Sequence, residues 1–127
     1  MPAQLLSSLP EARTAHHRDD NVYDDGILRI EHDNYYVSCD GTVLQLPLKE
    51  FLILSRLARN TDRIVSSEEI WQHAWKGRSS LNMQSLHVHI YRLRRRLALF
   101  GINIETMVNV GYRLIENPLV VERDNGV

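Results

Sequence analysis

The chain has 127 residues, of which 43% are hydrophobic, so it has the size and the apolar content of one ordinary domain. No apolar run approaches the length of a membrane-spanning helix, and the amino terminus lacks the basic start and long apolar region of a secretory signal. Cys39 is the only cysteine. An intramolecular disulfide is therefore excluded, a cytoplasmic location is expected, and inert packing or a redox-sensing thiol remain as roles for Cys39.

The charges are unevenly distributed along the chain. Fifteen basic and sixteen acidic residues give a net charge of −1 at pH 7. Seven of the basic residues but only one acid, Glu105, lie between positions 76 and 113, which leaves eight basic and fifteen acidic residues elsewhere. A phosphate-bearing partner responds to the local field more than to the total charge. We therefore expect such a partner to bind at residues 76–113.

The first part of the chain predicts an arm followed by a small sheet. Residues 1–20 are polar and aperiodic, which favours a disordered arm. Three strand-like runs follow at 26–31, 35–39 and 42–46, separated by the turn pairs Asp33–Asn34 and Asp40–Gly41. We expect an antiparallel sheet of three to four strands, which begins the domain predicted at residues 21–116.

Three helices are expected after the sheet. Pro47 opens the first helix, and Asn60 marks its end. Ser66, followed three residues later by Glu69, predicts a capping box at the start of the second helix. The polar loop 76–81 leads to a third helix at 82–99, for which Asn82 is the expected N-cap.

A hairpin is expected to close the domain. After Gly101, strand-like runs at 102–108 and 111–115 flank Asn109–Val110, with Asn109 and Gly111 where positive φ is needed. Residues 117–127 are expected to form a flexible tail. Strands, three helices and a hairpin in this order predict an α+β winged helix-turn-helix, in which the hairpin at 104–115 is the wing.

The third helix is predicted to have two faces. Its apolar residues recur at steps of four, three and four and form one narrow stripe: Leu86, Ile90, Leu93 and Leu97. At about 100° per residue, the opposite face carries a second set: Gln84, Val88, Tyr91, Arg92 and Arg95. A helix that is buried on one side and basic on the other can lie in a DNA groove. The alternative is a surface helix whose arginines only aid solubility.

From Leu44 to Leu114 the chain resembles the winged-helix DNA-binding output domain of two-component response regulators of the OmpR/PhoB type. The resemblance rests on four segments: KEFLILSRLARN (49–60), RIVSSEEIWQHAW (63–75), LHVHIYRLRRRL (86–97) and VGYRL (110–114). It implies a bacterial, sequence-specific, DNA-binding transcriptional regulator. The third helix is then expected in the major groove and the wing at the backbone or minor groove.

The chain departs from the pattern of this family at four points. We expect no receiver domain of the kind that normally precedes the output domain, because 127 residues leave no room for both. Leu46 stands before Pro47, where the family usually has Thr or Ser. Val108 replaces the arginine of the wing, and Gln84 stands where an arginine is frequent near the start of the third helix. The last two changes remove charge and predict weaker affinity or altered reading of DNA.

Base reading is expected at Val88 and Arg92, which lie one turn apart and match the base-reading positions of the family. Arginine can bind a guanine edge with two hydrogen bonds, and valine can pack on a thymine methyl group. The alternative for Val88 is a merely exposed apolar side chain. Gln84 and Ser85 lie at the amino end of the helix, where side chains and free N–H groups can meet phosphate or an adenine edge.

Two further groups of residues have competing roles. Arg95 is assigned to the DNA backbone, whereas at least one of Arg94 and Arg96 is expected to pair within the protein. Tyr112 either gives its hydroxyl group to a phosphate or buries its ring. The complete predicted contact set is as follows: Gln84, Ser85, Val88, His89, Tyr91, Arg92, Arg94, Arg95, Arg96, Lys76, Arg78, Thr106 and Tyr112.

The histidines and tryptophans invite other readings. His87 and His89 are two positions apart on a helix and point about 200° from each other, so they form a poor metal pair even with His73 as a third candidate ligand. The family resemblance places His89 near the DNA-facing surface, where it can donate to a phosphate. Trp71 and Trp75 are expected in the core, although Trp75 can also reach the DNA backbone.

Catalysis has little support, because the chain lacks a Gly-rich phosphate loop, a nucleophile motif and recognisable paired carboxylates. We expect no enzyme activity, no cofactor and no metal. The competing function is a winged-helix module that binds RNA polymerase or another regulator without reading DNA. The expected partners are double-stranded DNA, RNA polymerase through the loop 76–81, and a second copy on DNA, at the nucleoid in the cytoplasm.

Overall fold

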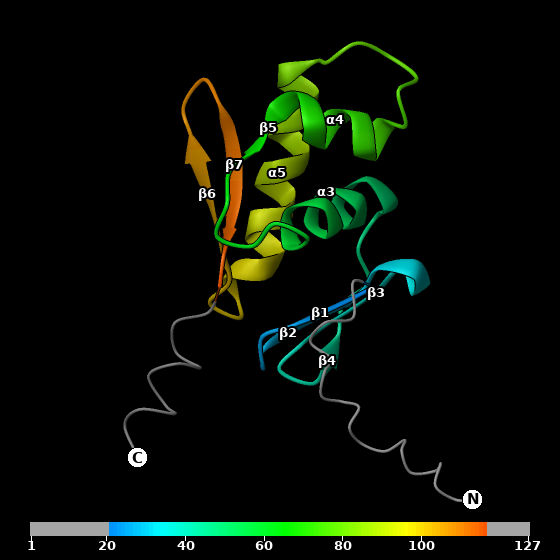
Figure 1. Cartoon of the computed structure of the whole chain (residues 1–127). Coiled ribbons are helices and arrows are strands. Elements are labelled where there is room, and N and C mark those ends of the chain that lie inside the picture. The colour runs from blue at the N-terminus through cyan, green and yellow to red at the C-terminus, as the bar shows by residue number, and fades with distance from the viewer. Residues whose placement is uncertain (1–20, 117–127) are drawn as a thin grey trace, which may run out of the picture.

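The computed structural model describes residues 21–116, so the arm predicted at 1–20 and the tail predicted at 117–127 lie outside the described residues. An N-terminal sheet, three helices and a C-terminal hairpin follow one another along the chain (Figure 1). This is the α+β order that the sequence predicts. No helix between residues 21 and 116 is long and apolar enough to cross a membrane.

The N-terminal sheet has four antiparallel strands in the order β1-β2-β3-β4. These are β1 (Val22–Asp24), β2 (Leu28–Glu31), β3 (Tyr36–Cys39) and β4 (Thr42–Val43). The strand-like runs did not include β1, because its three residues form a strand only through pairing with β2. The turn expected at Asp33–Asn34 is a 3-10 helix, η2 (His32–Asn34), which ends at Tyr35 with a positive φ of 51°.

The three helices are α3 (Leu48–Ala58), α4 (Ser67–Trp75) and α5 (Met83–Ala98). The predicted capping box is confirmed, because the Ser66 side chain accepts from the backbone N–H of Glu69 at 3.1 Å and Glu69 bonds back to the Ser66 backbone. The predicted cap of α5 is also confirmed: Asn82 Oδ1 accepts from the Ser85 N–H at 3.0 Å. Both helices of the helix-turn-helix therefore begin where their capping residues fix them.

The hairpin consists of β6 (Asn103–Met107) and β7 (Gly111–Ile115), which we call the wing. A two-residue strand, β5 (Val65–Ser66), pairs with the other edge of β7 and was not predicted, because two residues carry no periodic pattern. Asn109 has the expected positive φ of 64°, but the same expectation for Gly111 is wrong. Glycine is required there for another reason: an added Cβ would lie 2.0 Å from the Val65 carbonyl oxygen.

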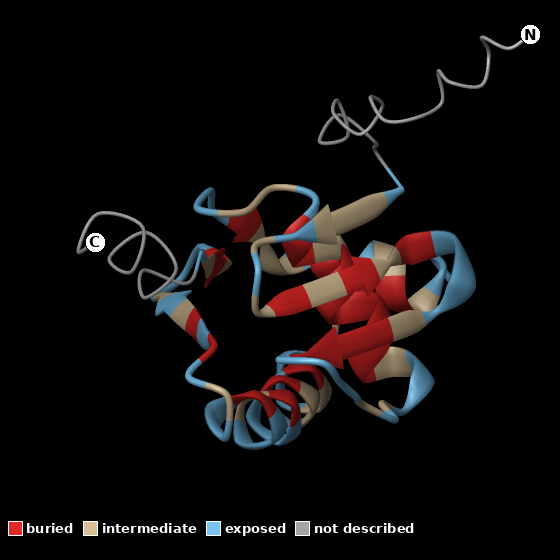
Figure 2. Cartoon of the chain, turned by 90° about the horizontal axis from the view of Figure 1, so that it is seen from below, coloured by how far each residue is buried: buried red, intermediate tan, exposed pale blue. Residues whose placement is uncertain are grey.

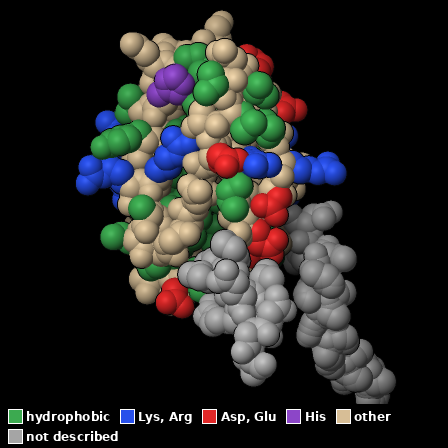
Figure 3. Space-filling view, turned by 90° about the vertical axis from the view of Figure 1, so that its left-hand side faces the viewer, with side chains coloured by type: hydrophobic (Ala, Val, Ile, Leu, Met, Phe, Trp, Pro, Cys, Tyr) green, Lys and Arg blue, Asp and Glu red, His purple; other side chains and the backbone are tan. Residues whose placement is uncertain are grey.

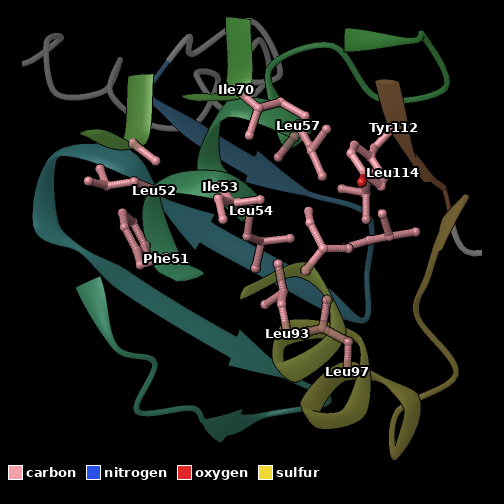
Figure 4. Packing of buried hydrophobic residues seen from close by; sticks show 14 of the residues in the cluster. Phe51, Leu52, Ile53, Leu54, Leu57, Ile70, Leu93, Leu97, Tyr112 and Leu114 are labelled. Carbon is pink, nitrogen blue, oxygen red and sulfur yellow. The ribbon is translucent and has the colours of Figure 1, made fainter. Parts of the chain in front are cut away.

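One core joins the N-terminal sheet, the three helices and the wing. Figure 4 shows side chains of α3, α5 and β7 converging, among them Leu54, Leu93, Leu97 and Leu114. The buried residues lie on the inward faces of the sheet and helices, whereas the outer faces are exposed (Figure 2). The core therefore holds α5 from one side and leaves its opposite side at the surface.

Candidate nucleic-acid interface

The predicted division of α5 into two faces is confirmed. The four residues of its apolar stripe are completely or almost completely buried: Leu86, Ile90, Leu93 and Leu97. On the opposite side Val88 is 44% exposed and Tyr91 is 59% exposed. Gln84, Arg92 and Arg95 are exposed on the same side. We call these five residues the outer face of α5.

Arg94 connects α5 to the wing. Its Nε donates to the backbone carbonyl of Ile104 at 2.9 Å, and its Nη2 donates to Thr106 Oγ1 at 2.5 Å. Its guanidinium group also lies 5.8 Å from the ring centroid of Tyr112. One side chain therefore contacts both strands of the hairpin, so Arg94 braces the wing, and Thr106 is its partner. The prediction that at least one of these arginines pairs within the protein is confirmed.

Arg96 connects α5 to α3. Its Nε lies 2.9 Å from Oε1 of Glu50, a carboxylate on α3 that is only 1% exposed. Two positions along a helix turn a side chain by about 200°, which is why Arg94 and Arg96 reach opposite neighbours. A buried carboxylate requires such a partner, because unpaired burial of its charge is costly. Arg96 therefore pairs with Glu50 inside the protein, while its own side chain stays 45% exposed.

Arg92 and Arg95 remain at the surface. Arg92 has no hydrogen bond or ion pair with any residue between 21 and 116. Arg95 Nη1 donates to the hydroxyl group of Tyr91 at 3.3 Å, and its guanidinium lies 5.9 Å from the Tyr91 ring centroid. Both charges face solvent without a carboxylate partner, so both are available to a negatively charged ligand.

The amino end of α5 differs in part from the expectation. The N–H of Ser85 is not free, because it donates to Asn82 Oδ1. The carbonyl of Ser85 accepts from His89 Nδ1 at 2.8 Å. Ser85 therefore serves the cap and the orientation of the His89 ring, while Gln84 keeps an exposed side chain.

A stacked aromatic pair lies beside His89. The rings of Trp71 and Trp75 are parallel within 9° with centroids 3.7 Å apart, and the His89 ring is perpendicular to Trp75 at 5.2 Å. Lys49 Nζ, from the first turn of α3, lies 5.4 Å from the Trp75 ring centroid. The sequence did not mark Lys49 as a site residue, because only the tertiary packing of α3 against α4 places it beside α5.

The loop between α4 and α5 adds two exposed cations, Lys76 and Arg78. Trp71 holds this loop by donating its indole N–H to the Ser79 carbonyl at 2.9 Å. Burial lowers the pKa of nearby His73, and the positive charges of Lys76, Arg56 and Arg59 lower it further. The loop thus places two positive charges beside the end of α4.

The wing contributes apolar surface and little net charge. Arg113 pairs with Glu105 across the two strands at 2.6 Å. At the tip Val108 is 77% exposed and Val110 is 53% exposed. A hollow of about 600 Å³ separates the wing from the amino ends of α4 and α5. Its lining includes several apolar side chains: Leu81, Met83, Met107, Val108 and Val110. On the face shown in Figure 3, hydrophobic side chains lie among the charged ones, several of them at the upper end.

Burial and packing show the surroundings of Tyr112, His87 and His89. Tyr112 is 3% exposed, and burial raises its pKa, so the structure shows the buried ring and not a presented hydroxyl group. His87 lines the hollow while His89 packs on Trp75, so the two rings point apart. Among the described residues no three His, Cys, Asp or Glu side chains group to hold a metal.

Cys39 lies in the core, and its environment favours inert packing. The side chain is completely buried, and burial, together with the charges of Asp25 and Asp40, raises the pKa of its thiol to about 11. A thiol that is both buried and protonated is a poor nucleophile.

Comparison with known proteins identifies the family. Residues 41–114 match the family described as "Transcriptional regulatory protein, C terminal". The chain belongs to this family. Over 99 residues it is 30% identical to the sensory transduction protein RegX3 of Mycolicibacterium smegmatis. This match covers 76% of this chain and 43% of that protein. Over 92 residues it is 37% identical to the regulatory protein VanRB of Enterococcus faecalis, and the match covers 72% of this chain and 41% of that protein. The chain thus spans less than half the length of these relatives.

Solved structures of the family share the fold. The DNA-binding domain of CpxR from E. coli matches with a TM-score of 0.66 and 25% identity, over 76% of this chain and 97% of that domain. The RstA DNA-binding domain of Klebsiella pneumoniae, solved in complex with the RstA box, matches with a TM-score of 0.64 and 26% identity. This match covers 75% of this chain and 97% of that domain. The OmpR/PhoB resemblance and the winged-helix fold are therefore confirmed.

Proposed function

We propose that the chain is a sequence-specific DNA-binding transcriptional regulator that acts by binding alone. The outer face of α5 carries this proposal: the core holds the helix by its other side, and Arg92 and Arg95 face solvent without carboxylate partners. A helix with this arrangement fits the width of the DNA major groove. Membership of the family and the complex of RstA with its DNA box support the same function.

The residues have different tasks in this proposal. Val88 and Arg92 read bases from neighbouring positions on the outer face. The phosphate contacts come from three exposed cations: Arg95 on the outer face of α5, and Lys76 and Arg78 in the loop beside it. Five other members of the predicted set support these contacts from within the domain: Ser85, Arg94, Arg96, Thr106 and Tyr112.

Three wider assignments belong to the same proposal. Two copies occupy half-sites about one helical turn apart, so that both α5 helices lie on one side of the duplex. The loop 76–81 contacts RNA polymerase, and its attachment to Trp71 gives that contact a fixed shape. The site of action is the nucleoid in the cytoplasm.

A second candidate is a winged-helix module that binds a protein and does not read DNA. The exposed valines at the wing tip and the apolar hollow beside them favour this candidate. Exposed apolar surface of this kind is typical of protein interfaces. The unpaired arginines on α5 favour DNA, and the following experiment separates the two functions.

Selection from a random duplex library with the folded chain tests the proposal. We expect one enriched motif, and Arg92→Ala should weaken binding to that motif by about 1–3 kcal/mol while changing binding to a scrambled duplex much less. Arg95→Ala should weaken both duplexes alike, since a phosphate contact carries no sequence information. Absence of enrichment, together with elution from heparin at low salt, would favour the protein-binding module.

A further inference from the structure

We propose that the hollow between the wing and the amino ends of α4 and α5 binds a small molecule with an apolar body and one positive charge, and that this ligand and DNA exclude each other. The site stands on the hollow alone, whereas the exclusion of DNA rests on the proposed function. The hollow has a volume of about 600 Å³, within the range of small-molecule sites, which is roughly 300–1,000 Å³. A free small molecule is therefore the occupant that fits it.

Apolar side chains form much of the wall. Leu81 and Met83 come from the start of α5 or just before it, and Met107, Val108 and Val110 come from the wing. All five are at least partly exposed to solvent. An apolar ligand body that covers them removes this surface from water, which favours binding. The two methionines also adapt their unbranched side chains to the shape of a ligand.

Glu68 supplies the charge of the hollow. It is the one acidic residue of the lining, and among the described residues that line the hollow there is no Lys or Arg. Gln72 Nε2 donates to Glu68 Oε2 at 2.7 Å, but no cation between residues 21 and 116 pairs with this carboxylate. An unpaired carboxylate attracts a positively charged ligand and repels phosphate. The lining is therefore better matched to an apolar cation than to the DNA backbone.

The shape of the hollow is fixed by contacts within the domain. The Ser67 N–H donates to the Val110 carbonyl at 3.2 Å, which attaches the tip of the wing to the start of α4. The Val110 N–H donates to the Met107 carbonyl at 2.9 Å and closes the tip. Arg94 holds the wing to α5 through the Ile104 carbonyl. A ligand thus meets walls that are already ordered, which lowers the entropic cost of binding.

The hollow lies between the two elements that contact DNA in the proposed function. With α5 in the major groove and the wing at the backbone or minor groove, the DNA strand that separates the two grooves passes between them. His87 of α5 and Val108 at the wing tip both line the hollow, so this strand lies over its mouth. A ligand seated there and the DNA strand compete for one space. The ligand therefore acts as an effector that releases the regulator from DNA.

Three probes with the same indole ring test the charge preference of the hollow. Tryptamine carries a positive charge, indole-3-propionate a negative charge, and 3-ethylindole no charge. In ¹H–¹⁵N NMR titrations of the full chain, all three should shift amides of the wing tip and of the start of α5. Tryptamine should bind up to about fivefold more tightly than 3-ethylindole at low salt, which is the range of an exposed ion pair. Indole-3-propionate should bind most weakly.

Four variants separate the charge of the hollow from its apolar wall. Glu68→Gln should bind tryptamine and 3-ethylindole equally, whereas the matched control Asp33→Asn, an exposed carboxylate on η2 outside the hollow, should keep the preference. Val110→Ser should weaken all three probes alike. Leu99→Ser removes an exposed apolar side chain outside the hollow and should change none of them. Circular dichroism of each variant shows that the domain is folded.

Competition is measured with a generic duplex at low salt. Saturating tryptamine should lower the affinity of the wild type for the duplex, and the duplex should lower the affinity for tryptamine by the same factor. Neutral 3-ethylindole should compete as well, at its own higher concentration. Val110→Ser should need correspondingly more of either probe, which separates competition at the hollow from binding of tryptamine to the duplex itself.

The outcomes distinguish this inference from the proposed function. The inference fails if tryptamine gives no saturable shift at the hollow, or if the wild type binds the three probes equally. It also fails if tryptamine binds at the hollow and leaves the affinity for the duplex unchanged. If the wild type binds no duplex even without a probe, the proposed function fails, and the titrations with the three probes still decide the ligand site.

Discussion

Arg96 and Arg95 are neighbours in the sequence with opposite expected roles, so exchanging each for methionine separates stability from DNA binding. Arg96→Met leaves the Glu50 carboxylate, which is 1% exposed, without its partner at 2.9 Å. Removing one member of a buried ion pair typically costs about 3–5 kcal/mol. The Arg96 side chain is itself 45% exposed, so water screens part of this interaction. We therefore expect the free energy of unfolding to fall by about 2–3 kcal/mol.

Thermal unfolding and DNA titration measure the two effects. A loss of about 2–3 kcal/mol lowers the Tm of a domain of this size by roughly 10–20 °C. Arg95→Met should leave the Tm within a few degrees, because Arg95 contacts only the exposed Tyr91. In titrations well below either Tm, Arg95→Met should weaken DNA binding and make the salt slope shallower by about one, whereas Arg96→Met should not.

A double variant tests the cause of the instability. Glu50→Met combined with Arg96→Met removes both charges, and replacement of a buried pair by apolar side chains is often neutral or stabilising. The double variant should therefore recover most of the Tm lost in Arg96→Met. The reasoning is refuted if Arg96→Met keeps the wild-type Tm and weakens DNA binding as Arg95→Met does, because Arg96 would then be a phosphate contact.

Three further outcomes follow from single contacts. Gly111→Ala should destabilise the domain by about 1–3 kcal/mol or more in urea unfolding, since its Cβ would lie 2.0 Å from the Val65 carbonyl oxygen and force β5 away from β7. Arg94→Lys keeps the charge but loses the fork that reaches Ile104, so wing amides should exchange hydrogen faster, unlike those of an Arg95→Lys control. Cys39 should resist maleimide at pH 8 and react fully in urea, because its pKa is about 11 and it is buried; labelling of the folded chain would contradict this.

Local signals in the sequence predicted most of the fold. The capping residues Ser66 and Asn82 fixed the starts of two helices, because a cap depends on residues within one turn. The apolar stripe of α5 fixed its buried side, because helical period depends only on spacing. The short strands β1 and β5 were missed, since pairing with distant segments creates them. The sequence predicted glycine at position 111 for its backbone freedom, whereas the backbone of β5 excludes a side chain there.

The candidate site was harder to predict, because the helical period gives the direction in which a side chain points but not the element that packs against it. Arg92, Arg94, Arg95 and Arg96 form one basic run, yet the structure assigns them to three environments. Arg94 faces β6 and Arg96 faces α3, and each finds an acceptor there. Only knowledge of the packed elements separates these two from the exposed pair. Lys49 was missed for the same reason, because it lies 33 residues before Asn82 and reaches the site through packing alone.

Lysines and an arginine from neighbouring elements lie on one flank of α5. The wing neutralises its own charges through Glu105 and Arg113 and presents valines at its tip. The other flank, formed by α3 and the loop after α4, carries Lys49, Lys76 and Arg78. Ionic contact depends on salt, and apolar contact depends on it little. The proposed complex is therefore asymmetric: the loop side supplies the salt-dependent attraction, and the wing supplies contact by shape.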